Sequence, residues 1–295
     1  MFKLIAYGIL LLALLAPGNA LATPMKVFVS ILPQKYFVEQ IGGDRVDVAV
    51  MVRPGDSPAV YEPKPAQMVA LTEARIYFAI DVPFERVWLK KIATANPKMR
   101  IAHTAQGIQK RRMESHHHAA EPASSREGDN HRTGILDPHV WLSPPLVRIL
   151  AKNILHALLE ADPGHSQIYH DRFNRFIKEI DEIHAELQAV FKDAQGMRFM
   201  VFHPAWGYFA ETYGLEQVPV EIEGKAPKPG QLRELIDFAK DHGIKVIFVQ
   251  PQFSIKHAKL IAREISGRVV LADPLAENWS ENLRQQAKVF KAALK

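Results

Sequence analysis

The sequence predicts an α/β protein with two lobes, each built on a mainly parallel sheet, joined by one long linker helix with a cleft between the lobes. Three observations lead to this fold class. From Lys26 onward, short β-branched runs alternate with longer segments of helical period, which is typical of α/β units. One amphipathic segment in the middle of the chain is longer than an average globular helix. A similar stretch of sequence also opens each half.

Eight short runs rich in β-branched residues are candidate strands, four in each half of the chain. β-branched side chains favour an extended backbone, whereas apolar residues at a 3.6-residue spacing occupy one face of a helix. The candidate strands are 27–31, 46–52, 76–80, 100–103, 198–202, 218–222, 245–249 and 269–272. The candidate helices are 64–72, 144–160, 231–242 and 256–266. Each half therefore contains the elements of one α/β lobe.

The long central segment follows Pro163-Gly164. Its apolar residues recur with a 3.6-residue period over about six turns, which predicts one helix. They are Tyr169, Phe173, Phe176, Ile177, Ile180, Ile183, Leu187, Val190 and Phe191. A helix in this place would be a stiff connector that limits how far the lobes swing apart, unlike a Gly/Ser linker.

An internal similarity indicates that the two lobes share one architecture. Residues 27–42 and 199–214 both read strand, proline, and then Tyr-Phe-x-Glu-x-x-Gly. Nothing in the chain recurs at a fixed period beyond this pair, so an array of repeats is not predicted. A match this short also arises by chance, which is the alternative interpretation.

The first 22 residues resemble a secretory signal peptide. Lys3 precedes an apolar run over 4–15, and small residues end the segment at Ala22. Because the run is too short to span a bilayer, we expect cleavage after Ala22 and a product exported to the periplasm; an uncleaved anchor is the alternative. The chain then divides into an N-terminal α/β lobe (23–162), a linker helix (163–192) and a C-terminal α/β lobe (193–295).

Composition excludes several kinds of site. The chain has 295 residues and no cysteine, so thiolate zinc sites, Fe–S clusters, disulfide scaffolds and Cys nucleophiles are ruled out. Any transition metal must therefore be held by His, Asp or Glu. The formal net charge of +5 is spread along the chain, which is typical of a solvated surface and does not indicate nucleic-acid binding. The sequence also lacks the common nucleotide-binding and hydrolase motifs.

Polar residues follow several candidate strands where ligands bind in parallel sheets, beyond the carboxyl ends. His203 and Asp273 each follow a strand, and His139 lies in a turn before a helix. A neighbouring proline restricts the backbone at all three positions. Two imidazoles and one carboxylate suit Zn(II) and tolerate Mn(II) or Fe(II), and they would place a metal between the lobes. A structural histidine and a simple Asp-Pro turn are the alternatives.

One polar, low-complexity segment over 109–132 has no apolar periodicity and predicts a surface loop. Its histidines form a weak metal-attracting tract, with incidental solvated histidines as the alternative. They are His116, His117, His118 and His131.

Two motifs resemble those of the zinc and manganese substrate-binding proteins of ABC importers, the high-affinity zinc-uptake family. They are Asp137-Pro-His-Val-Trp141 and Val201-Phe-His-Pro-Ala-Trp-Gly-Tyr-Phe209, and further similar segments are 54–58, 61–63, 248–254 and 273–275. The resemblance implies two lobes bridged by a long helix, with the metal enclosed between them. It also implies that His139, His203 and Asp273 are metal ligands, and a histidine at 203 resembles the zinc-type members.

The chain departs from that family at two positions. The resemblance implies a first metal-binding histidine at position 59, where this chain has Ala59. Gln250 stands where the family commonly has glutamate, which removes a charge near the site. Water or a loop histidine would complete the zinc shell; a changed ligand and a loss of affinity are the other two interpretations.

These observations predict a periplasmic solute-binding protein, not an enzyme, that binds Zn(II), or less favourably Mn(II), and delivers it to an inner-membrane ABC permease. We expect a monomer that binds no nucleic acid. One alternative is a family member that takes Mn, Fe or a metal complex, or that has lost metal affinity. A zinc metallohydrolase with an open three-ligand site is another, with Glu62 or Glu223 as its base. A surface adhesin is the third.

Overall fold

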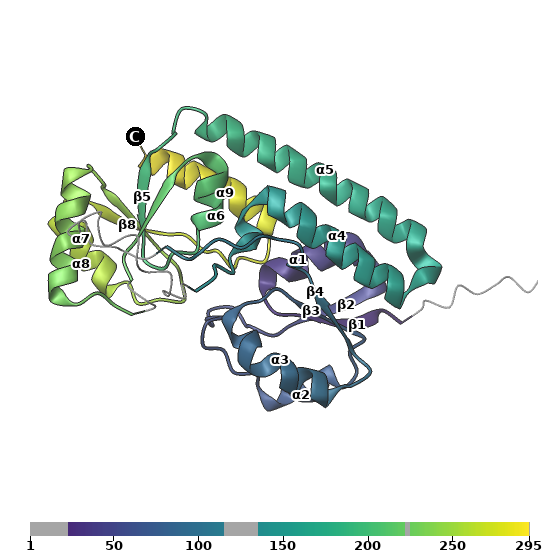
Figure 1. The fold of residues 1–295 in the computed structure, drawn as a ribbon. Helices are drawn as coiled ribbons and strands as arrows, with labels where there is room; N and C mark the ends of the chain where they lie inside the picture. Colours follow the sequence, from purple (N-terminus) through teal and green to yellow (C-terminus); the bar gives the residue numbers. More distant parts are fainter. Residues whose placement is uncertain (1–22, 115–134, 222–224, 295) are drawn as a thin grey trace, which may run out of the picture.

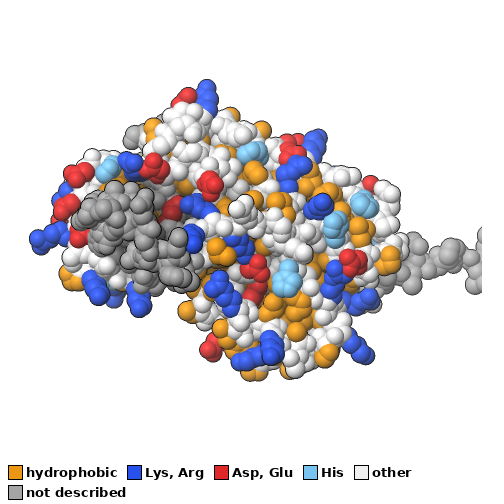
Figure 2. Space-filling model, viewed as in Figure 1, with side chains coloured by type: hydrophobic (Ala, Val, Ile, Leu, Met, Phe, Trp, Pro, Cys, Tyr) orange, Lys and Arg blue, Asp and Glu red, His pale blue; other side chains and the backbone are white. Residues whose placement is uncertain are grey.

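Two α/β lobes lie side by side in the computed structural model, which describes residues 23–114, 135–221 and 225–294 (Figure 1). The expected signal peptide and the loop histidines fall outside the described residues. Within those ranges, no helix has the length and apolar character needed to cross a bilayer. Acidic and basic side chains are interspersed over the face shown in Figure 2, in agreement with a solvated surface.

The N-terminal lobe is a four-stranded parallel sheet with its helices. The strand order is β2-β1-β3-β4. Its elements are β1 (Met25–Val29), α1 (Leu32–Gly42), β2 (Val46–Val50), α2 (Pro65–Leu71), β3 (Ile76–Ala79), α3 (Pro83–Ala95), β4 (Arg100–His103) and α4 (Pro144–Ala161), with short 3-10 turns η1 (Gly43–Arg45), η3 (Val140–Leu142) and η4 (Pro163–His165).

The C-terminal lobe repeats this topology. Its four parallel strands follow the order β6-β5-β7-β8, so the first strand of each lobe lies inside its sheet between the second and the third. The elements are β5 (Arg198–Val201), α6 (Gly207–Tyr213), β6 (Glu216–Pro219), α7 (Pro229–Asp241), β7 (Val246–Val249), α8 (Lys256–Glu264), β8 (Arg268–Leu271) and α9 (Trp279–Ala293). The internal similarity of the sequence thus corresponds to a shared lobe architecture.

The predicted long helix is α5 (Ser166–Phe191), with 26 residues. It runs along both lobes in Figure 1 and packs against α4, α1 and α9. The face that it buries carries six of the nine predicted apolar positions: Tyr169, Phe176, Ile180, Ile183, Leu187 and Phe191. The other three positions are only partly buried against the core.

Four helices were not among the predicted ones. The short α1 and α6 lie in the repeated segment, and α3 and α9 carry many charged residues among their apolar positions. In α9 the apolar residues Trp279, Leu283, Ala287 and Phe290 are buried at spacings of four, four and three. That spacing is a helical signal, so α9 was recognisable from the sequence.

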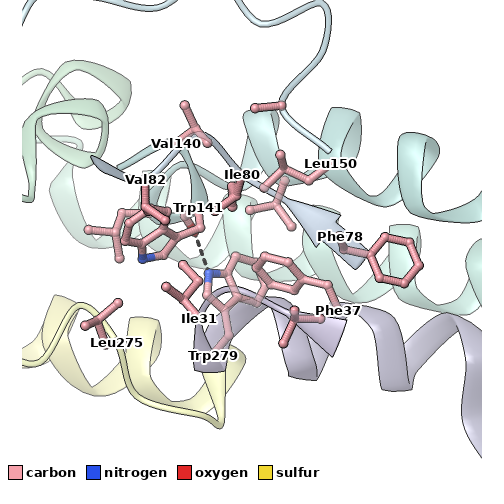
Figure 3. Close-up of a cluster of buried hydrophobic side chains, with 14 of the residues drawn as sticks. Ile31, Phe37, Phe78, Ile80, Val82, Val140, Trp141, Leu150, Leu275 and Trp279 are labelled. Carbon is pink, nitrogen blue, oxygen red and sulfur yellow. Dashed lines mark hydrogen bonds between the residues drawn. The ribbon is translucent and has the colours of Figure 1, made fainter. Parts of the chain in front are cut away.

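The C-terminal helix and the turn before α4 join the two lobes through aromatic packing (Figure 3). The indole nitrogen of Trp279 donates to the backbone oxygen of Trp141 at 2.7 Å, and that of Trp141 donates to the backbone oxygen of Pro274 at 2.7 Å. Trp279 also packs edge-on against Phe37 of α1, with ring centroids 5.2 Å apart. One buried apolar cluster therefore extends through both lobes.

Replacing Trp279 by alanine should destabilise the whole protein, because its side chain is buried and contacts elements of both lobes. We expect a loss of about 3–5 kcal/mol in the free energy of unfolding, measured by urea denaturation. Val69→Ala on the exposed surface of α2 is the control, with a change within about 0.5 kcal/mol. A loss below about 1 kcal/mol for Trp279→Ala would contradict this role of α9.

Candidate metal centre

His139 occupies the turn that leads into η3. Asp137 holds it in two ways: Oδ1 of Asp137 accepts from the backbone N–H of His139 at 3.0 Å and from ring Nδ1 at 2.7 Å. Pro138 lies between the two and fixes the backbone of the turn. The imidazole is buried beside the Trp141 ring, with centroids 5.2 Å apart. Its orientation is therefore set by the turn and by the aromatic core.

His203 follows β5 at the carboxyl end of the C-terminal sheet. Its Nδ1 lies 2.6 Å from Oε1 of Glu221, and its ring stacks on Phe253 with centroids 5.0 Å apart. The side-chain amide of Gln250 accepts from the backbone N–H of His203 at 3.2 Å and donates to its backbone oxygen at 2.6 Å. A carboxylate at position 250 could not make the second of these bonds, so glutamine fits this backbone.

The two imidazoles face each other across the interface between the lobes. Their Nε2 atoms are 3.4 Å apart. Since a carboxylate only accepts hydrogen bonds, a neutral ring in this place carries its proton on Nδ1 and keeps its lone pair on Nε2, on the side of the other ring. Two Zn–N bonds of about 2.0–2.1 Å at a tetrahedral angle place their nitrogens about 3.3–3.4 Å apart. The observed separation therefore matches two ligands of one tetrahedral zinc ion.

Burial lowers the pKa of His139 below its usual value, and the neighbouring Asp137 opposes this effect in part. The neutral imidazole is the form that binds metal, because its Nε2 lone pair is then free. Burial and the hydrogen bond at Nδ1 thus both leave His139 ready to act as a ligand.

Asp273 lies beyond the end of β8, apart from the histidine pair. Its Oδ1 accepts from the backbone N–H of Leu275 at 2.9 Å and from the amide of Gln252 at 3.4 Å. It lines a pocket of about 260 Å³ that is formed by both lobes and also contains Arg53 and Glu277. Among the described residues no three His, Asp or Glu side chains are grouped closely enough to hold a metal ion. The structure therefore brings the two histidines together but does not add Asp273 to them.

The remaining candidates fall into separate places. Ala59 is exposed on a loop, where its backbone N–H contacts Oγ of Ser57 at 3.3 Å. Glu62, considered as a catalytic base, is exposed three residues after Ala59. Glu223 falls outside the described residues. Trp141 packs against His139, whereas Trp206 packs against Phe290 in the core.

Sequence reasoning missed the two carboxylates that hold the histidines. Asp137 stood within the recognised turn, two residues before His139, where its side chain could reach the ring. Glu221 follows β6 at the carboxyl end of the same sheet as His203. The rule that placed His203 at a strand end would also have selected Glu221, because β5 and β6 are adjacent.

Comparison with known proteins places this geometry in context. The family model of ZnuA, the periplasmic zinc-uptake complex component A, matches residues 27–293. The chain belongs to this family. A crystal structure of ZnuA is 39% identical and superposes with a TM-score of 0.83, covering 92% of this chain and 100% of that one. A zinc-bound deletion mutant of ZnuA is 40% identical, with a TM-score of 0.83, 92% of this chain covered and 98% of that one.

Curated relatives of the family are more distant in sequence. The high-affinity zinc uptake system protein ZnuA of Bacillus subtilis is 26% identical over 85% of this chain and 78% of its own length. The zinc-binding protein AdcA of Streptococcus pyogenes is 27% identical over 85% of this chain, which spans 50% of AdcA. The fold is shared by a Mn-bound periplasmic metal-binding protein from Candidatus Liberibacter asiaticus. That structure is 19% identical, with a TM-score of 0.77, and the match covers 92% of this chain and 100% of that one.

Zinc affinity should depend on pH in the direction set by His139. Because its pKa is lowered by burial, we expect affinity to hold above about pH 6.5 and to fall as the pH drops further and protons compete at the ring. As the pH falls, His139 takes up a proton at a higher pH in the unfolded chain than in the folded protein, because its folded pKa is lowered. The stability of the metal-free protein should therefore also decrease below about pH 6.5. Competition titrations with a chromophoric chelator from pH 7.5 to 5.5 measure the first effect, and equal affinity across that range would contradict it.

Proposed function

We propose that this protein binds Zn(II) between its two lobes in the periplasm and delivers it to an inner-membrane ABC permease. The observation that carries the proposal is the pair of imidazoles of buried His139 and half-buried His203, whose Nε2 atoms lie at the separation of two ligands on one zinc ion. Membership of the zinc-uptake family supports the same conclusion. Two nitrogen ligands also favour zinc over manganese, which prefers oxygen ligands.

We further propose Asp273 as the third ligand. The Asp273–Pro274 segment is tied to the histidine turn, because the backbone oxygen of Pro274 accepts from the indole of Trp141, two residues after His139. To join the pair, the Asp273 side chain would have to rotate and give up its hydrogen bonds to Gln252 and Leu275. Zinc sites of two histidines and one carboxylate are common, and they leave a fourth position to water.

Ala59 fits a zinc shell that has this open fourth position. It stands where the family resemblance implies a first metal-binding histidine, and its methyl group cannot bind a metal. It is exposed to water on a loop of the N-terminal lobe. We therefore propose a working zinc site with three protein ligands and one water, within a mature chain of two lobes (23–162 and 193–295) linked by residues 163–192.

Replacing His203 by alanine tests the ligand set directly. We expect zinc affinity to fall by more than the roughly 10–100-fold that is typical of losing an outer hydrogen-bond partner, because a direct ligand is removed. Isothermal titration of the chelator-stripped mature protein measures the change, with Asp273→Asn expected to weaken binding less severely. His170→Ala, at an exposed position on α5, is the control and should bind zinc as the parent does. Unchanged affinity in His203→Ala would refute the proposed site.

Replacing Ala59 by histidine tests the open position. A fourth protein ligand in place of water should tighten zinc binding by roughly tenfold or more, equivalent to about 1.4 kcal/mol or more of binding free energy. The same calorimetric titration measures it, and Val60→His at the neighbouring exposed position is the control. No gain in Ala59→His would mean that another group of the protein already completes the shell.

A further inference from the structure

Two buried carboxylates lie behind the histidine pair, one hydrogen-bonded to each ring. Asp137 is 1% exposed and Glu221 is 4% exposed, and their ion-pair contacts are with His139 and His203. No Lys or Arg of residues 23–114, 135–221 and 225–294 pairs with either carboxylate. Arg111, which lies near Asp137 around Gly207, is paired with Glu114 and Glu211 instead.

Such an arrangement suits a divalent cation. Buried Asp and Glu are almost always paired with a cation or bound to a metal, because removing a charge from water is costly. Each carboxylate accepts from one Nδ1, so a neutral ring keeps its lone pair on Nε2. The two Nε2 atoms face each other 3.4 Å apart. One divalent cation between them would take both lone pairs, with one carboxylate behind each ring.

We infer that Asp137 and Glu221 are positioning residues that tune the site for a divalent cation. Each keeps one imidazole in the tautomer whose Nε2 faces the metal, and each places one negative charge behind the ring that binds the ion. This inference rests on the proposed function and deepens it. The charge that favours the ion thus comes in part from the groups behind the histidines.

The backbone of both residues is held independently of their carboxylates. The backbone N–H of Asp137 donates to the oxygen of Arg111 at 2.9 Å, and the hydroxyl of Tyr208 donates to the backbone oxygen of Asp137 at 3.1 Å. The backbone N–H of Glu221 donates to the oxygen of Phe202 at 3.0 Å. Amide replacements of the same shape should therefore leave the fold intact, which separates a role in metal binding from a role in folding.

The experiment compares Asp137→Asn and Glu221→Gln with the parent protein, using Zn(II) alone as the probe. Each amide removes one negative charge, and its NH₂ group can donate to Nδ1 and so move the ring proton to Nε2, where it blocks the metal. We expect a 10–100-fold loss of zinc affinity in each variant. The thermal midpoint of the metal-free protein should stay equal or rise, because an uncompensated buried charge has been removed.

Imidazole ¹⁵N chemical shifts report the tautomer directly and give a readout that a purely structural role would not move. In the metal-free parent, His139 and His203 should show protonated Nδ1 and unprotonated Nε2, and the variant should shift toward the other tautomer at the histidine it contacts. Glu216→Gln, an exposed glutamate on β6 paired with Arg198, is the matched control and should change neither affinity nor tautomer.

Two outcomes would overturn the inference. One is unchanged zinc affinity in both amide variants; the other is a loss of affinity accompanied by a fall in the metal-free thermal midpoint and unaltered histidine tautomers. His203→Ala separates this result from a failure of the proposed function. If His203→Ala loses zinc while both amide variants keep it, only the role of the carboxylates is wrong. If His203→Ala keeps zinc, the proposed site itself is wrong and the inference falls with it.

Discussion

The hydrogen bond from the indole of Trp279 to the backbone oxygen of Trp141 is the constraint on which the rest of the structure depends. Trp141 lies two residues after His139, and its indole binds the backbone next to Asp273. Trp279 begins α9 and packs onto α1 of the opposite lobe. The same buried cluster that joins the lobes therefore also fixes the turns that carry the candidate ligands. Metal geometry and lobe packing are consequently not independent properties of this chain.

The long α5 helix extends this coupling along the molecule. Its buried face packs on α1 and α4 of one lobe and on α9, while an exposed Arg284–Glu186 pair ties it to α9 at the surface. The hydroxyl of Tyr36 on α1 contacts both Glu179 of α5 and Ser280 of α9. These contacts join three helices of the two lobes, whose packing also brings the two imidazoles to 3.4 Å.

Much of this fold was readable from the sequence, and the site was readable in part. The strands and α5 were predicted because β-branched runs and a long 3.6-residue period act locally. Strand ends differ by one to three residues, as for β6 at 216–219 against the predicted 218–222, because pairing with β5 sets them. That His203 meets His139 follows from packing between lobes, which no local pattern encodes. The separate position of Asp273 depends on side-chain hydrogen bonds that the sequence does not reveal.

The identical strand order of the two sheets makes their chemical difference informative. In each sheet the second and third strands lie on opposite sides of the first strand. Such a switch in strand order opens a crevice at the carboxyl end of the first strand. In the C-terminal lobe that crevice presents His203. In the N-terminal lobe the equivalent end of β1 carries Ser30, whose hydroxyl donates to the buried carboxylate of Glu85. The duplicated framework is symmetric in topology but carries a histidine beyond only one of its two first strands, so the N-terminal lobe presents His139 from the turn before η3 instead.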